Sequence, residues 1–131
     1  LVDACNEVAR VNVTCIELQT KNVQVLEAKG YSVIRGDFLL RTPLPMFDRV
    51  VMNPPFGKKA DIAHVVHAAR YLKPGGRVVS VMSAGTIFRT DAATKEFRDK
   101  LRPSFEPLPP LSFRESGTSV NAVIAVIDTE A

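Results

Sequence analysis

Short apolar runs alternate along the chain with segments that repeat apolar residues every three or four positions. The short runs occupy residues 11–17, 31–38, 47–53 and 77–83. β-Branched and aromatic residues are common in them, which is typical of buried strands. The helical spacing between the runs is typical of amphipathic helices. The pattern therefore predicts strands and helices in alternation.

Helical spacing predicts helices over residues 1–9, 19–29, 58–73 and 90–101. Gly30 stands where a helix C-cap glycine belongs, and the "KPGG" sequence ends the third helix. The apolar stripe of the third helix contains Ile62, Val65, Val66, Ala69 and Leu72. The fourth helix is expected to turn Ala93, Phe97 and Leu101 inward.

Alternating strands and helices predict an α/β fold with a mostly parallel sheet. Two further strand-like stretches, residues 104–113 and 121–128, have no helix between them, so the last strand is expected to return antiparallel. The sequence contains no internal repeat and no low-complexity tract. A single domain over residues 1–131 is expected.

Acidic residues end the first two apolar runs, where an open parallel sheet binds its ligands. Glu17 could accept hydrogen bonds from two ribose hydroxyls, or simply interact with the dipole of the next helix. Asp37 follows Gly36 and could accept a hydrogen bond from an adenine amine, or belong to an ordinary turn. Two carboxylates on successive strands fit a nucleoside lying along this edge.

The third run stops on Asn53, Pro54, Pro55 and Phe56, a change from apolar strand to "NPPF". Two prolines cannot continue a central strand, and they fix the direction of the neighbouring carbonyl groups. The Asn53 side-chain oxygen and the Pro54 carbonyl could accept both N–H bonds of one planar amine. Phe56 offers a ring on which a flat group stacks. An ordinary proline loop is the alternative interpretation.

The order of these features resembles class I S-adenosylmethionine-dependent methyltransferases of the amino-methylating group, whose [DNS]-PP-[YF] tetrapeptide holds the target amine. The stretches 61–89 and 113–124 are similar to phage- and plasmid-type DNA adenine-N6 methyltransferases. The resemblance implies a Rossmann-like fold and S-adenosyl-L-methionine as cofactor. It assigns the cofactor to Glu17, Asp37, Phe38 and Asn53, and the substrate amine to Asn53, Pro54, Pro55 and Phe56.

One departure from this family concerns its glycine-rich loop, which follows the first strand and precedes the first helix. The chain starts with Leu1, already in a helical pattern. The family's first strand is therefore expected to be lacking here, and a G-x-G-type segment is expected upstream. Cofactor binding by this chain alone would then be weakened.

Basic and polar residues lie on the loops that are expected at the same edge. Phosphate contacts are assigned to Lys58, Lys59, Arg89 and Arg114, although surface solubility accounts equally well for any one of them. The substrate side is assigned Ser116, Thr118 and Asn121, beside Glu115. The formal net charge of +3 is compatible with a polyanionic partner.

The sequence offers no signal for a metal site, a disulfide or a membrane span. His64 and His67 are expected on a solvated helix surface, so no metal site is predicted. Cys5 and Cys15 have no CxxC spacing and are expected as free thiols. The sequence has no apolar run of membrane-spanning length and no signal peptide. A cytoplasmic protein of prokaryotic, phage or plasmid origin is expected.

Methyl transfer to an exocyclic amine, with adenine N6 in DNA as acceptor, is the function predicted from the sequence. Guanine N2 in RNA and the amide of a protein glutamine present the same planar amine and remain alternatives. A non-catalytic, degenerate methyltransferase or nucleic-acid-binding module is a third interpretation. A dinucleotide-dependent dehydrogenase would lack its phosphate fingerprint here and would leave the two prolines unexplained.

Overall fold

The computed structural model describes residues 14–17, 20–108 and 122–130. The chain divides into two compact units, Leu1–Thr42 and Pro43–Ala131. The opening helix expected over residues 1–9 lies outside the described residues, as does Cys5.

The unit Leu1–Thr42 is built on two parallel strands, β1 (Thr14–Glu17) and β2 (Ser32–Arg35), which are connected by α2 (Thr20–Ala28). Two parallel strands need a crossover of this kind, and the helix provides it. Gly30, with φ +89°, ends the helix in the left-handed conformation expected of a C-cap glycine. The short turn η1 (Phe38–Leu40) follows β2.

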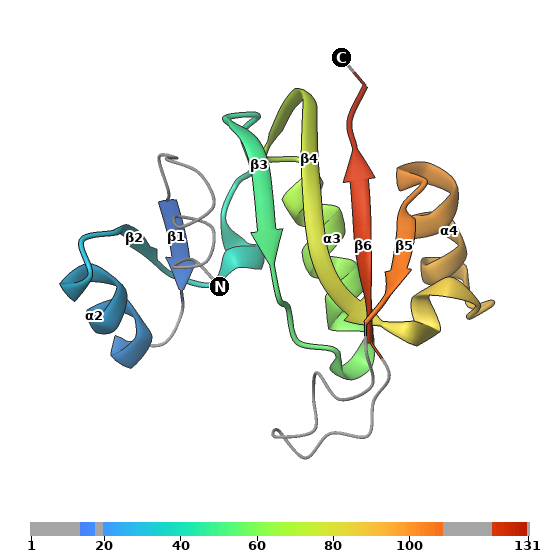
Figure 1. The fold of residues 1–131 in the computed structure, drawn as a ribbon, viewed down its shortest axis with the longest axis horizontal. Coiled ribbons are helices and arrows are strands. Elements are labelled where there is room, and N and C mark those ends of the chain that lie inside the picture. Colours follow the sequence, from blue (N-terminus) through green and yellow to red (C-terminus); the bar gives the residue numbers. More distant parts are fainter. Residues whose placement is uncertain (1–13, 18–19, 109–121, 131) are drawn as a thin grey trace. The chain divides into compact units, whose positions relative to one another are not determined.

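The unit Pro43–Ala131 contains a four-stranded sheet in the order β3-β4-β6-β5. Its strands are β3 (Phe47–Met52), β4 (Leu72–Ser83), β5 (Ser104–Pro107) and β6 (Ala122–Asp128). β3 runs parallel to β4, whereas β6 runs antiparallel to both β4 and β5 (Figure 1). The Rossmann-like α/β fold with an antiparallel last strand is therefore confirmed.

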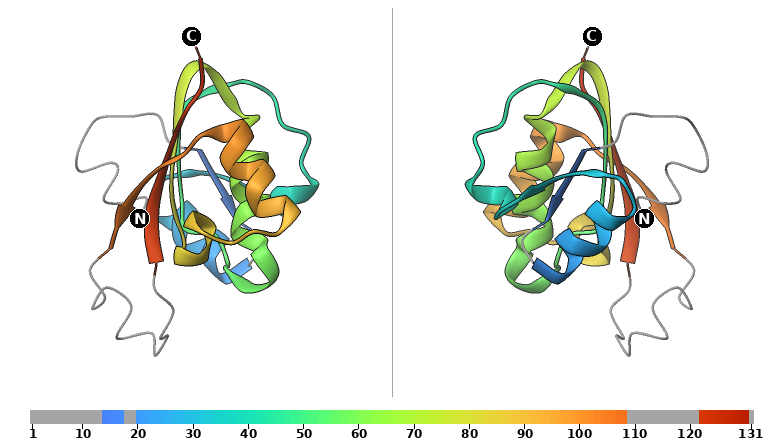
Figure 2. Two further views of the ribbon diagram at one scale, coloured as in Figure 1. Left: turned by 90° about the vertical axis from the view of Figure 1, so that its right-hand side faces the viewer. Right: turned by 90° about the vertical axis from the view of Figure 1, so that its left-hand side faces the viewer.

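Two helices, α3 (Ala60–Ala69) and α4 (Ala92–Leu101), lie on the same face of this sheet (Figure 2). The core contains alternate residues of β4, of which Val78 and Met82 are fully buried. They stand directly opposite Ile127 and Val123 of β6, which are also buried. Strand alternation thus places one face of both central strands in the core.

The inner faces of the helices differ in part from the expected stripes. Ile62, Val65 and Phe97 are buried as expected, but Val66 is 40% exposed and Ala93 is also exposed. Ala68 occupies the inner face of α3 because that face is centred on Val65, three residues earlier.

The expected continuation of α3 to the "KPGG" sequence is wrong, because the helix already ends at Ala69. Leu72 has by then joined the sheet opposite Phe47, and the next paired residues are Arg49 and Arg77. The four residues between Leu72 and Arg77 therefore form a bulge of β4 that packs tightly on β3. A Cβ at Gly76 would lie 2.9 Å from the Lys73 carbonyl oxygen, so the bulge requires glycine there.

Candidate active site

The carboxyl ends of β3 and β4 meet at one edge of the sheet, because the strands are parallel with Met52 opposite Ser80. The ladder of β3 stops at Met52, immediately before the two prolines, as the sequence predicts. Asn53 is exposed, Pro54 is buried and Phe56 is half-buried. The side chain of Asn53 makes no hydrogen bond to any described residue. The buried Pro54 therefore anchors a loop that leaves the amide of Asn53 at the surface.

Two consecutive lysines with left-handed backbone connect this loop to α3. Lys58 has φ +53° and Lys59 has φ +60°, within the turn η2 (Gly57–Lys59). Side chains other than glycine resist this conformation, at about 1–2 kcal/mol per residue. Such strain persists only where neighbouring contacts hold it, and it is common at functional sites. The ion pair of Lys59 with Asp91 and the hydrogen bond between Asp61 and the backbone of Ser83 hold this backbone in place.

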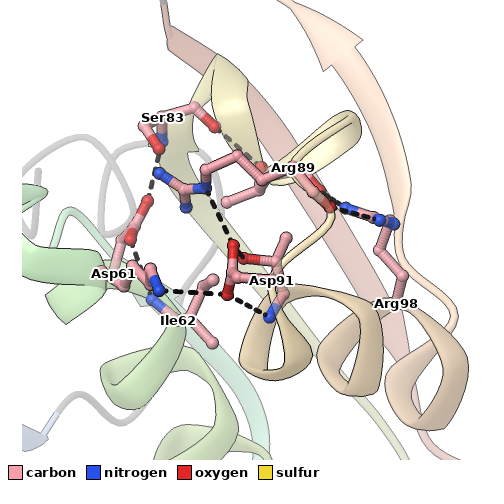
Figure 3. A network of polar contacts seen from close by, with 9 residues as sticks. Asp61, Ile62, Ser83, Arg89, Asp91 and Arg98 are labelled. Atoms are coloured by element: carbon pink, nitrogen blue, oxygen red, sulfur yellow. Dashed lines mark hydrogen bonds and ion pairs between the residues drawn. The ribbon is translucent and has the colours of Figure 1, made fainter.

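Asp61, one residue into α3, is a fully buried carboxylate that the sequence analysis did not select. Its Oδ1 accepts the backbone N–H of Ile62 at 3.0 Å, and its Oδ2 accepts the backbone N–H of Ser83 at 2.9 Å. Ser83 is the last residue of β4, so Asp61 joins the start of α3 to the end of the neighbouring strand (Figure 3). The signal was present in the sequence, since Asp61 precedes the buried Val65 and Ala68 at helical spacing.

Asp91 forms ion pairs with Lys59 and Arg89, two of the residues for which the sequence predicts phosphate contacts. Its carboxylate lies 3.2 Å from Lys59 Nζ and 3.9 Å from Arg89 Nε. The same carboxylate caps α4, because Thr94 donates to it through both its backbone N–H and its hydroxyl, at 3.0 and 2.8 Å. These two bonds, assisted by Lys59, lower the pKa of Asp91 well below its ordinary value. The two hydrogen bonds from Thr94 to Asp91 also explain why Thr94, rather than Ala93, is buried.

Arg89 points back toward Ser83 and Asp61 (Figure 3). Its Nε and Nη2 are buried and, like the hydroxyl of Ser83, have no hydrogen-bond partner among the described residues. The ion pair with Asp91 is too long for a hydrogen bond. A phosphate contact through these two nitrogens would require Arg89 to turn outward. Its role in binding phosphate stays a prediction.

Glu17 and Asp37 lie at the carboxyl ends of neighbouring parallel strands in the unit Leu1–Thr42. The backbone places Glu17 at the end of β1, opposite Arg35 at the end of β2. Asp37 comes two residues later and is exposed, with Oδ1 accepting the backbone N–H of Leu39 at 3.0 Å. Phe38 is half-buried beside it. The strand ends thus bring both acidic residues to one edge of the small sheet.

The remaining predicted substrate residues lie outside the described residues: Arg114, Ser116, Thr118 and Asn121, together with Glu115. The strands on either side of this segment are described. β5 ends and β6 begins at the edge where β4 ends, since Pro107 pairs with Val123 and Ser83 with Ala122.

The expectation that both histidines are solvated is wrong, because His64 and His67 are half-buried. His64 Nδ1 lies 2.8 Å from the Ala60 carbonyl oxygen, and His67 packs edge-on against Tyr71 with ring centroids 5.5 Å apart. The described part of the chain has no group of three or more residues suited to hold a metal ion. Within the same residues, none of the helices combines the length and apolar character needed to cross a membrane.

Solved structures with the same fold include several methyltransferases. A Listeria monocytogenes protein assigned to the class I S-adenosylmethionine-dependent methyltransferases is 12% identical, with a TM-score of 0.76 over 99% of this chain and 49% of that one. A T. thermophilus 16S rRNA guanine-N2 methyltransferase, solved with AdoMet and guanosine, is 21% identical, with a TM-score of 0.64 over 94% of this chain and 30% of that one. A modification subunit assigned to a type I restriction enzyme of Vibrio vulnificus is 19% identical, with a TM-score of 0.71 over 100% of this chain and 35% of that one.

The chain spans about half or less of the length of these solved proteins. A comparison with curated proteins found no match. The sequence profile of the methyltransferase small domain matches residues 3–99, which include β1 to β4 and the Asn53–Phe56 loop. The chain therefore belongs to the methyltransferase small domain family.

Proposed function

We propose that this protein transfers a methyl group from S-adenosyl-L-methionine to an exocyclic amine, and that the acceptor is adenine N6 in DNA. One observation carries the proposal: the Asn53–Phe56 loop stands at the carboxyl end of β3 with Asn53 exposed and Pro54 buried. An asparagine that served the core would be buried and hydrogen-bonded instead. Membership of a methyltransferase family supports the reaction type.

The chemistry of the loop follows from its two acceptors. Asn53 Oδ1 and the Pro54 carbonyl oxygen would accept the two N–H bonds of a planar amine. Those hydrogen bonds favour a more tetrahedral nitrogen, whose lone pair is then available for reaction. Phe56 would support the ring that carries the amine. These residues position the acceptor, and positioning is the main catalytic resource of such a site.

The residues of the unit Leu1–Thr42 fit the nucleoside part of the cofactor. Glu17 would accept from the ribose hydroxyls and Asp37 from the adenine amine, beside Phe38. Asp37 uses one oxygen for Leu39, but a carboxylate can accept about four hydrogen bonds. When bound, the cofactor would supply an electrophilic methyl group to the acceptor nitrogen, and the amine would release one proton to solvent.

DNA is favoured as the substrate by the residues around the loop. Lys58 and Lys59 follow Phe56 after Gly57 and are exposed, so they can contact phosphate groups. A base whose amine must reach Asn53 has to leave its stack, and cations beside the pocket stabilise the displaced backbone. The structural likeness to a type I restriction modification subunit agrees with this choice.

Guanine N2 in RNA is the second candidate acceptor, and the T. thermophilus structure solved with guanosine favours it. A guanine N2 amine is planar and has two N–H bonds, so the same acceptors would hold it. A glutamine side-chain amide would also fit the loop, and it is an outcome that the test must distinguish.

The test measures transfer of radiolabelled methyl groups from S-adenosyl-L-methionine to separate pools of DNA, RNA and protein, with the full-length protein. Transfer to adenine in DNA is expected. Asn53→Ala should abolish transfer while calorimetry shows nearly unchanged cofactor affinity, because Asn53 acts on the acceptor. Asn53→Asp serves as the matched control, since it keeps a side-chain oxygen and should retain measurable activity. Full activity of Asn53→Ala would refute the proposed role, and an inactive parent that does not bind the cofactor would support a non-catalytic module.

A further inference from the structure

An exposed apolar pair stands at the end of the short turn η3 (Ala84–Ile87), which follows β4. Ile87 is 45% exposed and Phe88 is 70% exposed. Among the described residues, Phe88 is the one aromatic side chain that is exposed rather than buried or half-buried. A phenylalanine in water forgoes the stabilisation that burial gives, so its position calls for a reason.

The backbone around this pair is held by a single guanidinium. Arg98 donates from Nη1 to the carbonyl oxygen of Thr86 at 2.8 Å and from Nη2 to that of Arg89 at 2.6 Å (Figure 3). The two carbonyl groups flank Ile87 and Phe88 on either side. The hydroxyl of Thr86, a fully buried residue, donates to the Ser83 carbonyl oxygen at 2.7 Å. The apolar pair therefore projects from a fixed turn and not from a loose loop.

The side chain of Arg89 points inward, whereas that of the preceding residue, Phe88, is exposed. The backbone N–H groups of Phe88 and Arg89 both donate to the Gly85 carbonyl oxygen, at 3.2 and 2.8 Å. A Cβ at Gly85 would lie 3.1 Å from Arg89 Nη1, so the arginine packs over a glycine that leaves room for it. The turn thus directs a cation inward and leaves an aromatic ring outside.

The pair lies on the same edge of the sheet as the Asn53–Phe56 loop. β3 and β4 both end there, and Asp91 ties Arg89 to Lys59, three residues after Phe56. The exposed Lys58 and Lys59 bring positive charge to this edge. Two apolar side chains beside cations suit a partner that has flat apolar faces on an anionic backbone, which describes nucleic acid. They offer far less apolar surface than the roughly 800 Å² per partner of a stable protein interface.

We propose that Phe88, supported by Ile87, is a wedge that contacts the base stack next to the target base and stabilises the gap that the extruded base leaves. The inference rests on the proposed function, because it assumes a nucleic-acid substrate. Apolar side chains inserted between base steps serve this purpose in other proteins that distort DNA. The clamp formed by Arg98 would keep the wedge in place while the stack opens.

The experiment compares Phe88→Ala with the full-length parent on one duplex oligonucleotide and on its single strand, both carrying the target base. KM for the duplex should rise by about 5- to 150-fold, the range that corresponds to one base–aromatic stack. The rise should be several-fold smaller on the single strand, which has no stack to open. A duplex with 2-aminopurine at the target position should show a reduced fluorescence increase on binding. Phe88→Trp keeps a flat ring and should restore both signals.

Leu44→Ala is the matched control, since Leu44 is 56% exposed and precedes β3 at the opposite edge of the sheet. It should behave as the parent does. If the parent is active and Phe88→Ala has an unchanged duplex KM, the wedge is refuted and the proposed function is not. A lower melting temperature or weaker cofactor binding of Phe88→Ala would also refute the wedge alone. A parent that methylates protein but no nucleic acid would overturn the proposed acceptor and the wedge together.

Discussion

The buried carboxylate of Asp61 permits a prediction whose size follows from its contacts. Its two oxygens accept the backbone N–H groups of Ile62 and Ser83, and the residue has no exposed surface. Asp61→Ala leaves both donors buried without an acceptor, at roughly 1–3 kcal/mol each, or about 2–6 kcal/mol together. Asp61→Asn keeps one acceptor and should lose about half as much. Small domains have only about 5–15 kcal/mol of stability, so Asp61→Ala should unfold readily.

Urea unfolding of the full-length protein, followed by circular dichroism, measures these differences. Asp128→Asn is the control, because Asp128 is an exposed carboxylate that pairs with Arg77, at the end of the β4–β6 ladder away from Ser83. Exposed ion pairs contribute little, so this variant should resemble the parent. If Asp61→Ala falls within about 0.5 kcal/mol of the parent, Asp61 does not hold the two segments together and the reasoning fails.

Two further predictions concern the same edge of the sheet. The pKa of Asp91 is lowered from 3.8, first by the Thr94 hydroxyl and then by the Thr94 backbone N–H. The stability that Asp91 contributes is therefore complete at pH values above 3.8 and is lost as the pH falls below 3.8. In urea titrations, Asp91→Asn should lose less stability than the parent between about pH 5 and pH 2. Equal losses in the two proteins would contradict this. Lys58 has φ +53°, so Lys58→Gly should keep or raise the melting temperature, while Lys58→Val should cost about 1 kcal/mol or more; a valine variant as stable as the glycine variant would refute the strain.

Local sequence signals predicted the fold and the position of the loop. Pro54 and Pro55 cannot extend a ladder, so the end of β3 at Met52 follows from the sequence alone. Gly30 marked the end of α2 for a similar reason, since it adopts positive φ. These residues act through their own backbone restrictions, which do not depend on distant partners.

Features that depend on distant partners escaped the sequence analysis. Lys59 pairs with Asp91, and Asp61 binds the backbone of Ser83, yet the spacing of these residues says nothing about their contact. The helical spacing of Asp61 with Val65 did place it on the inner face of α3, but a charged residue at a helix start is usually read as a surface residue. Phe88 was passed over because most phenylalanines are expected in the core.

The strand order also governs when this sheet can assemble. β6 lies between β4 and β5, although the ribosome makes it after both. Among the described strands, β5 pairs with β6 alone, so β5 has no partner until Ala122–Asp128 has emerged, and the edge of β4 that pairs with β6 stays open until then. Pairing of such high contact order is slow and exposes strand edges meanwhile. Nascent chains of this protein therefore keep an open, aggregation-prone edge on β4 until β6 arrives.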